Sequence, residues 1–330
     1  KGQFPFWVPM QALIPTAKRF LDVIKLKKNF LRGSYPPIIT PFKSNGAVDY
    51  DSFRNCVDFS IRNGSHGLLI SGTTSEPSTL TLDERIQLYK EAIDVNKGRI
   101  PMVCATGSQS EAETQVLSDG AEKAGADALL VVTPYYIRPP QRGLAKYYIN
   151  VCKRTDLPVM IYHIPGRTAI NVTMDTLKEI TAAAPNMVGM KHAVNDLGFC
   201  THMIKEFGPE WRVFVGLEDL SFPMLCVGAC GLMNAVGNLQ PKKLSQMCEA
   251  VDASDLKRAK KLHYELTELN ESVFFDTNPI PIKYMMWRMG LIAKNNHRLP
   301  MAPAGAEVAK RLDGVMKRAG LKRGKLKKKK

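Results

Sequence analysis

Residues 187–191 read Met-Val-Gly-Met-Lys, and residues 159–163 read Val-Met-Ile-Tyr-His. Both runs are short, nearly continuous in apolar residues, and become polar only at the carboxyl end. A half-exposed strand alternates apolar and polar side chains, whereas a strand buried on both faces of a parallel sheet does not. The two runs therefore predict buried parallel strands, one of which ends in Lys191.

The same kind of run recurs from Gly33 onward, and amphipathic stretches separate the runs. Strands are expected at residues 35–40, 66–71, 102–106, 128–133, 159–163, 187–191, 213–216 and 231–235. Helices are expected after a Thr-x-x-Glu capping box at 81–84 and at 112–123, 143–153 and 173–182. Eight βα units predict an α/β fold of the (β/α)8 TIM barrel type.

More helices are expected than a barrel needs. Amphipathic stretches continue at 242–250, 256–270, 282–289 and 308–319. We therefore expect a C-terminal helical extension beside the barrel. The predicted division is an N-terminal basic arm or targeting segment at 1–32, the barrel at 33–240, the helical region at 241–320 and a basic tail at 321–330.

The formal net charge of +15 belongs to the two ends of the 330-residue chain. Residues 1–33 hold seven basic residues and one acidic residue, and residues 316–330 hold nine basic residues and no acidic one. The remaining residues carry 30 charges of each sign. A fold without net charge argues against specific nucleic-acid binding, and no apolar run reaches the roughly 18 residues of a membrane span.

The seven cysteines are odd in number and form no Cys-x-x-Cys pair, which indicates reduced thiols and a cytoplasmic location. The six histidines show no His-x-x-x-His or His-Glu-x-x-His spacing, and no phosphate-binding Gly-rich loop or Gly-x-Ser-x-Gly elbow is present. We therefore expect neither a metal site nor a cofactor.

Reactive groups of such a barrel lie where strands end and βα loops begin. Lys191 ends its strand with no acidic neighbour in the sequence, a setting in which burial disfavours the ammonium form. A neutral amine can attack a ketone. The alternative is a lysine whose side chain extends from the strand to water.

Other polar residues follow the expected strands. Two phenols, Tyr136 and Tyr162, could transfer protons near the hydroxyl of Thr73, or could be packing residues. The guanidinium of Arg167 suits a substrate carboxylate, although a surface ion pair is the alternative.

Six motifs together resemble the dihydrodipicolinate synthase family, in the group of class I pyruvate lyases that includes N-acetylneuraminate lyase. They are Gly-Thr-Thr-Ser-Glu at 72–76, Pro-Tyr-Tyr-x-x-Pro-x-Gln at 134–141, Tyr-x-x-Pro-Gly-Arg-Thr at 162–168, Gly-Met-Lys at 189–191, Asn-Pro-Ile-Pro-Ile-Lys at 278–283 and Arg-Leu-Pro-Met at 298–301. The resemblance extends from about Gly33 to Gly320.

The resemblance implies a role for each matching residue. Lys191 would form an imine with pyruvate, and Thr73, Tyr136 and Tyr162 would relay protons. The substrate-binding residues would be Thr74 for the pyruvate carboxylate, Arg167 for the carboxylate of aspartate semialdehyde, and Met233. Tyr135 would reach into a neighbouring subunit of a homotetramer or homodimer.

Three departures from the family bear on specificity and regulation. The family usually has glycine in place of Ser75 and an acidic residue in place of His192, and both positions flank the pocket. Lysine-inhibited members carry Asn and His side chains where this chain has Gln109, Leu82 and Arg85, although Glu113 matches. Weak or absent feedback inhibition by lysine is therefore expected.

Three functions are consistent with the sequence. The first is condensation of pyruvate with L-aspartate 4-semialdehyde to 4-hydroxy-tetrahydrodipicolinate, in lysine biosynthesis. The second is a pyruvate-dependent aldolase or dehydratase acting on a 2-keto-3-deoxy acid or another aldehyde partner. The third is a barrel without catalysis that binds a partner through its basic tails.

Overall fold

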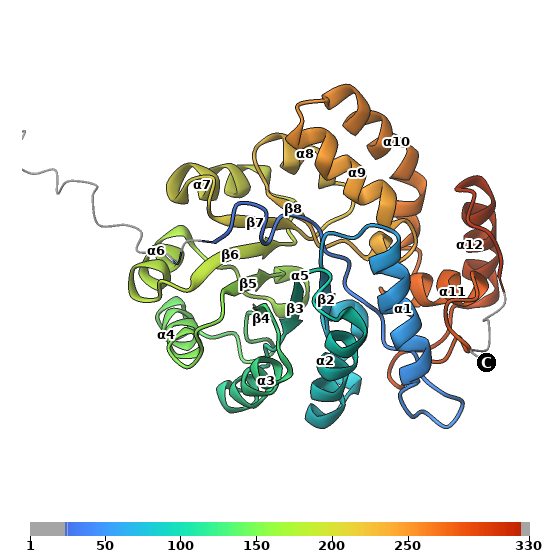
Figure 1. Ribbon diagram of the computed structural model, residues 1–330. Helices are drawn as coiled ribbons and strands as arrows, with labels where there is room; N and C mark the ends of the chain where they lie inside the picture. The colour runs from blue at the N-terminus through green and yellow to red at the C-terminus, as the bar shows by residue number, and fades with distance from the viewer. Residues whose placement is uncertain (1–23, 25, 325–330) are drawn as a thin grey trace, which may run out of the picture.

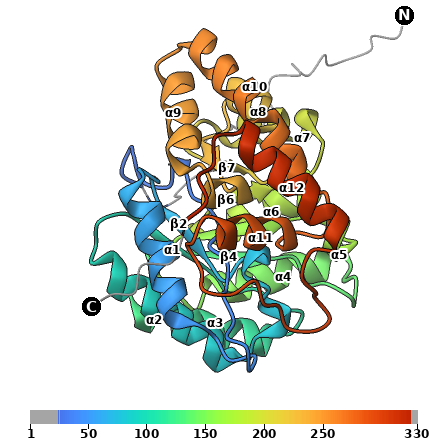
Figure 2. The same cartoon turned by 90° about the vertical axis from the view of Figure 1, so that its right-hand side faces the viewer.

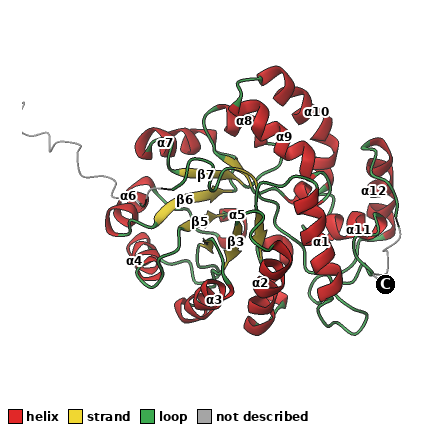
Figure 3. Cartoon of the chain, in the orientation of Figure 1, coloured by secondary structure: helices red, strands yellow, loops and turns green. Residues whose placement is uncertain are grey.

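A computed structural model describes Ile24 and residues 26–324. Eight parallel strands form one sheet in the order β1-β8-β7-β6-β5-β4-β3-β2. An isolated parallel bridge between Pro37 and Leu69 joins its two edges. Helices surround the sheet on the outside (Figure 1, Figure 3). The predicted (β/α)8 barrel is therefore confirmed.

The strands are short and buried. They are β1 (Gly33–Ser34), β2 (Leu68–Ile70), β3 (Met102–Ala105), β4 (Ala128–Val132), β5 (Val159–His163), β6 (Met187–His192), β7 (Arg212–Val215) and β8 (Gly231–Leu232). All eight expected strands are found, but the first lies at 33–34 instead of 35–40. Pro36 and Pro37 explain this shift, since proline has no N–H to donate to a ladder.

Each expected helical segment is found within a few residues. The helices are α1 (Tyr50–Arg62), α2 (Leu82–Asn96), α3 (Glu111–Ala124), α4 (Gln141–Cys152), α5 (Pro165–Thr168), α6 (Met174–Ala183), α7 (Leu197–Phe207), α8 (Ser221–Cys226), α9 (Pro241–Asp252), α10 (Leu256–Ser272), α11 (Ile280–Arg288) and α12 (Ala306–Arg318), with 3-10 turns η1 (Thr73–Ser75), η2 (Pro77–Thr79) and η3 (Ala235–Asn238). Of these, α1, α5, α7 and α8 are helices that the sequence analysis did not specify. The predicted capping box is present at Thr81 and Glu84.

The C-terminal helices pack beside the barrel. Helix α9 contacts β1 and β8, α10 packs on α9, and α12 packs on α11 and α10. Figure 2 views the side that bears α11 and α12, with α1 next to them. The division of the chain at residues 240 and 320 stays a prediction.

Two groups of apolar side chains form the core. One fills the space between strands and helices, and the other fills the barrel interior. Leu31 belongs to the interior group, and the buried guanidinium of Arg212 donates to the carbonyl oxygen of Phe30 at 3.1 Å. The described end of the predicted N-terminal arm therefore packs against the barrel. The rest of that arm, and residues 325–330 of the basic tail, lie outside the described residues.

Among the described residues, no helix combines the length and the apolar character needed to cross a membrane. Six of the seven cysteines are buried as free thiols, and Cys226 is exposed.

Candidate active site

A cavity of about 320 Å³ opens at the carboxyl ends of the strands. Its walls come from the loops after β2, β4 and β5 and from two C-terminal segments that do not belong to the barrel. These segments contribute Asn278, Pro279, Pro300 and Met301. The C-terminal region therefore completes the cavity.

Lys191 does not line this cavity itself but lies against Tyr162, which does. Strands β5 and β6 align so that Tyr162 is opposite Lys191, and the Nζ atom lies 4.3 Å from the centre of the phenol ring. The lysine is only 3% exposed, and Tyr162 lines the cavity. A Cβ atom on Gly216 would lie 3.1 Å from Cε of Lys191, so the glycine leaves room for the lysine chain. The side chain does not extend to bulk water.

Thr73 and Thr74 occupy the turn η1 above Tyr162. The Thr73 hydroxyl donates to the Tyr162 hydroxyl at 3.3 Å, and Thr73 and Tyr162 line the cavity. The Thr74 hydroxyl accepts a hydrogen bond of 3.1 Å from the side-chain amide of Asn278. A phenol and a hydroxyl in contact can pass a proton without placing a fixed charge in the cavity.

The two adjacent tyrosines lie in different places. Tyr135 lines the cavity of its own chain. Tyr136 is 88% exposed and has the positive φ of 69°, which is uncommon for an aromatic residue. Within one chain, the structure therefore joins Thr73 to Tyr162 but does not bring Tyr136 to them.

Arg167 lies in α5, a one-turn helix that the sequence analysis did not predict. The residue is exposed and lines the cavity mouth. Proline at the first position of α5 and a 2.8 Å hydrogen bond from the Ala169 N–H to the Pro165 carbonyl form this turn. A guanidinium at the entrance can bind a carboxylate of an incoming substrate.

Met233, Ser75 and His192 do not line the cavity. Met233 is buried in the apolar group that fills the barrel interior and includes Tyr162. Ser75 is fully buried and donates from its hydroxyl to the Ile38 carbonyl. His192 points away from the barrel interior and contacts His163. The departures at 75 and 192 therefore leave the cavity wall unchanged.

Glu218 is a buried acidic residue near Lys191 that the sequence analysis did not identify as a candidate site residue. It follows β7, is fully enclosed, and accepts a hydrogen bond from the Ala235 N–H at 2.6 Å. Burial raises the pKa of its carboxyl to about 7, against the effect of the backbone N–H donors and of the nearby Lys191 charge. Lys191 has no acidic neighbour in the sequence, and Glu218, which lies 27 residues further along the chain, is close enough for the Lys191 charge to affect its pKa.

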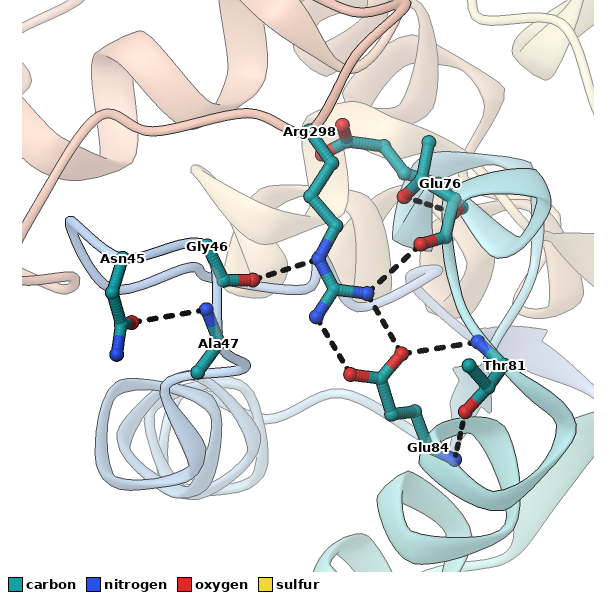
Figure 4. A network of polar contacts seen from close by, with 8 residues as sticks. Asn45, Gly46, Ala47, Glu76, Thr81, Glu84 and Arg298 are labelled. Atoms are coloured by element: carbon teal, nitrogen blue, oxygen red, sulfur yellow. Dashed lines mark hydrogen bonds and ion pairs between the residues drawn. The ribbon is translucent and has the colours of Figure 1, made fainter.

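Arg298 attaches the C-terminal wall to the barrel (Figure 4). Its guanidinium forms a two-bond contact with Glu84 at 2.6 and 2.7 Å and donates to the carbonyls of Gly46 and Thr79 at 2.7 and 2.9 Å. The partner Glu84 is also the third residue of the capping box of α2. One carboxylate thus fixes a helix start and the segment that carries Pro300 and Met301.

Among residues 26–324 there is no group of three or more His, Cys, Asp or Glu side chains that could hold a metal ion.

Comparisons with known proteins identify the family of this chain. Residues 30–319 match the sequence profile described as the Dihydrodipicolinate synthetase family. The chain is 40% identical over 291 residues to 4-hydroxy-tetrahydrodipicolinate synthase of Thermus thermophilus, an alignment that covers 88% of this chain and 97% of that protein.

Solved structures of similar proteins have the same fold. Dihydrodipicolinate synthase of Aquifex aeolicus superposes with a TM-score of 0.86 at 34% identity, over 88% of this chain and 98% of that chain. The enzyme of Acinetobacter baumannii, solved as a chloride-inhibited form complexed with pyruvate, superposes with a TM-score of 0.85 at 35% identity, over 88% and 99% of the chains. The chain belongs to the dihydrodipicolinate synthetase family.

Proposed function

We propose that this lyase condenses pyruvate with L-aspartate 4-semialdehyde to give 4-hydroxy-tetrahydrodipicolinate, a step of lysine biosynthesis. One observation carries the proposal: the buried Lys191 amine lies against Tyr162, whose hydroxyl contacts Thr73 at the base of a cavity. The names of the relatives and the pyruvate complex of one of them support the same substrates.

The chemistry begins at the Lys191 nitrogen. The amine attacks the keto carbon of pyruvate, water leaves, and an imine forms. The protonated imine withdraws electrons, so the methyl group of bound pyruvate loses a proton and an enamine forms. The enamine carbon then forms a bond to the aldehyde carbon of the second substrate, and the aldehyde oxygen takes up a proton. The amino group of the semialdehyde part then attacks the imine carbon, which closes the ring as the bond to the Lys191 nitrogen breaks and the free amine is restored. Tyr162 and Thr73 are placed to move these protons.

The cavity offers separate groups for the two substrates. The Thr74 hydroxyl lies beside Thr73 and would hold the pyruvate carboxylate near Lys191. Arg167 at the mouth would hold the carboxylate of the semialdehyde. Met233, which belongs to the same interior group as Tyr162, would be a further substrate-binding residue.

The alternative partner, a 2-keto-3-deoxy acid or another aldehyde, was favoured by Ser75 and His192. Neither side chain lines the cavity, whereas Arg167 does. We favour the semialdehyde because the Arg167 guanidinium at the mouth suits the carboxylate of that substrate. An assay that compares this substrate with a panel of aldehydes at equal pyruvate concentration tests the choice.

Reduction with borohydride in the presence of pyruvate tests the proposed mechanism. Peptide mass mapping should find a stable pyruvate adduct at Lys191 and nowhere else. The Lys191→Ala variant should take up no label. Labelling of another lysine, or of none, would contradict the proposal.

The active assembly is proposed to be a homodimer or homotetramer. The sequence analysis gave the contact with a neighbouring subunit to Tyr135, but Tyr135 lines the cavity of its own chain. We therefore assign this contact to Tyr136, which would complete the cavity of a neighbouring copy. The exposed ring of Tyr136 has no contact with Thr73 or Tyr162 in its own chain, yet the resemblance places it in the proton relay. An exposed aromatic side chain with constrained backbone is suited to insertion into a partner.

Mixing two inactive variants should restore activity if Tyr136 acts across the interface. In Lys191→Ala and Tyr136→Phe chains co-expressed at equal levels, half of the dimers are mixed, and each mixed dimer holds one intact site. About a quarter of wild-type activity is therefore expected. Variants that stay inactive after mixing would show that the tyrosine acts within its own chain.

Lysine is expected to inhibit the enzyme weakly or not at all. Arg85 is 6% exposed, lines the cavity, and donates to the Ser71 hydroxyl at 2.9 Å and to the Ala105 carbonyl at 2.8 Å. Among the described residues, no carboxylate lies within 4.0 Å of its guanidinium. This positive charge would repel the ammonium groups of lysine. Half-inhibition at submillimolar lysine in a steady-state assay would contradict the expectation.

A further inference from the structure

Two histidines lie directly behind the proposed catalytic pair. His163 follows Tyr162 in β5, and His192 follows Lys191 in β6. The strands align so that His163 is opposite His192, just as Tyr162 is opposite Lys191. Because side chains alternate along a strand, the histidines face the surrounding helices, where both rings stack near Phe199 of α7.

A chain of hydrogen bonds runs through both rings. The Val172 N–H donates to Nε2 of His163 at 3.3 Å, the two Nδ1 atoms are 3.3 Å apart, and Nε2 of His192 lies 3.1 Å from the Asp196 carbonyl oxygen. Only one assignment of protons satisfies every contact. His163 carries its proton on Nδ1 and donates to Nδ1 of His192, which carries its own proton on Nε2 and donates to Asp196.

Protonation of either ring would break this chain. A second proton on His163 would face the Val172 N–H, and a second proton on His192 would face the Nδ1–H of His163. Burial, and then the proximity of His192, lowers the pKa of His163 to about 4. Burial also lowers the pKa of His192. The Asp196 carboxylate opposes both shifts, as do the Asn171 side chain at His163 and the Asp196 carbonyl at His192.

The two ends of this chain of hydrogen bonds, at Val172 and Asp196, lie in loops that matter for the proposed reaction. Val172 closes the loop after β5, which contains α5 and Arg167. Asp196 caps α7 by accepting from the Phe199 N–H at 2.8 Å, and it closes the loop that follows Lys191. The histidine pair is therefore the buried polar link between these two loops.

We propose that His163 and His192 are positioning residues, a neutral hydrogen-bonded pair that fixes the loop of Arg167 relative to the strand of Lys191. The kinetic part of this inference rests on the proposed function. Neither ring lines the cavity, so the pair acts through Lys191, Tyr162 and Arg167 and has no contact with substrate.

The proton positions can be measured without any substrate. In the wild-type protein labelled with 15N in its histidines, ring-nitrogen spectra at pH 7 should show His163 as the Nδ1–H form and His192 as the Nε2–H form. The His163→Phe and His192→Phe variants assign the signals. A charged ring at pH 7, or the opposite proton position on either ring, would overturn the proposal.

Two variants at position 192 distinguish the effect of the hydrogen bonds of His192 from the effect of its ring packing. His192→Phe keeps an aromatic ring against Phe199 but removes both hydrogen bonds. His192→Asn places an oxygen near the former Nδ1 and can still accept from His163. We expect kcat/KM for the semialdehyde to fall by about 10- to 100-fold in His192→Phe, mainly through KM, and to recover partly in His192→Asn. An equal loss in both variants, or no loss, would overturn the proposal.

The pH dependence gives an independent measurement. In the unfolded chain both histidines take up protons near the ordinary pKa of 6.5, whereas in the folded chain His163 resists protonation until about pH 4. The stability contributed by the neutral pair is thus complete above pH 6.5 and is lost as the pH falls toward 4. The urea midpoint should decrease over this window in the wild type and decrease less in the His163→Phe, His192→Phe double variant. If the urea midpoint of the double variant falls with pH as steeply as that of the wild type, the proposal of a neutral histidine pair is wrong.

The experiments distinguish failure of the pair from failure of the proposed function. Borohydride trapping and condensation are first measured on the wild type. If the wild type is active, the variants test the pair alone. If it is inactive, the ring spectra and the urea midpoints still decide whether the neutral pair exists, and contrary results there overturn it.

Discussion

Replacing Lys191 by alanine is expected to lower kcat for the condensation by about 10³-fold or more, because the covalent route to the enamine requires this amine. The residue is 3% exposed and lies against Tyr162, which lines the cavity, and no lysine among the described residues lines the cavity itself. Steady-state turnover of pyruvate and semialdehyde measures the effect. Residual activity near the wild-type level would show that no imine at this position is needed.

The control for this variant is Lys205→Ala. Lys205 lies on the exposed face near the end of α7, so its loss should leave turnover unchanged. Circular dichroism and the urea midpoint of Lys191→Ala should remain close to wild type, because the variant removes an amine that makes no ion pair. A large loss of stability in Lys191→Ala would make the kinetic result a folding effect.

Two lysines are buried among the described residues, and their surroundings differ. Lys283 is fully buried and forms an ion pair of 2.7 Å with Glu76. Among the described residues, no carboxylate lies within 4.0 Å of the Lys191 amine. The Lys283 amine is held by the Glu76 carboxylate, whereas the Lys191 amine lies against the ring of Tyr162, whose hydroxyl contacts Thr73. Lys191 is therefore the better candidate for the imine.

Local sequence patterns predicted the barrel well, for reasons that lie within single segments. The apolar run at 159–163 matches β5 at both ends, and the hydroxyl and carboxylate of the 81–84 box cap α2 as expected. Strand burial and helix capping each depend on residues within one segment. The first strand was misplaced because its apolar run contains two prolines that cannot donate to the ladder.

Features that depend on contacts between distant segments could not be predicted from the pattern. Glu218 meets Lys191 only because β7 lies next to β6 in the barrel. His192 was interpreted as a residue that flanks the pocket, but strand alternation turns it toward the helices and His163. The contrast between Tyr135 in the cavity and Tyr136 outside it follows from one left-handed backbone angle, which the sequence pattern did not indicate.

The second large effect is expected for Lys283→Met, which should lower the free energy of unfolding by about 3–5 kcal/mol. The variant leaves the Glu76 carboxylate, whose side chain is 2% exposed, without its buried partner. Burial lowers the pKa of the Lys283 amine, and the Glu76 charge opposes that shift, so the amine depends on this carboxylate for its positive charge. Urea denaturation measures the loss.

The exposed pair of Lys243 and Glu265 gives the matched control. Its atoms lie 2.9 Å apart, but the side chains are 33% and 38% exposed. Lys243→Met should therefore cost less than about 1 kcal/mol. If Lys243→Met and Lys283→Met destabilise the protein equally, burial of the Lys283 pair has no special effect.

A double variant shows how this ion pair is linked to the active site. Glu76 follows the turn of Thr73 and Thr74, and its second carboxylate oxygen lies 3.3 Å from Nδ1 of His297, next to Arg298. Adding Glu76→Gln to Lys283→Met removes the uncompensated charge, so part of the lost stability should return. Activity should not return with it, because Glu76 also joins the threonine turn to the segment that carries Pro300 and Met301. If stability and activity both recover in the double variant, the ion pair of Lys283 and Glu76 contributes to stability alone.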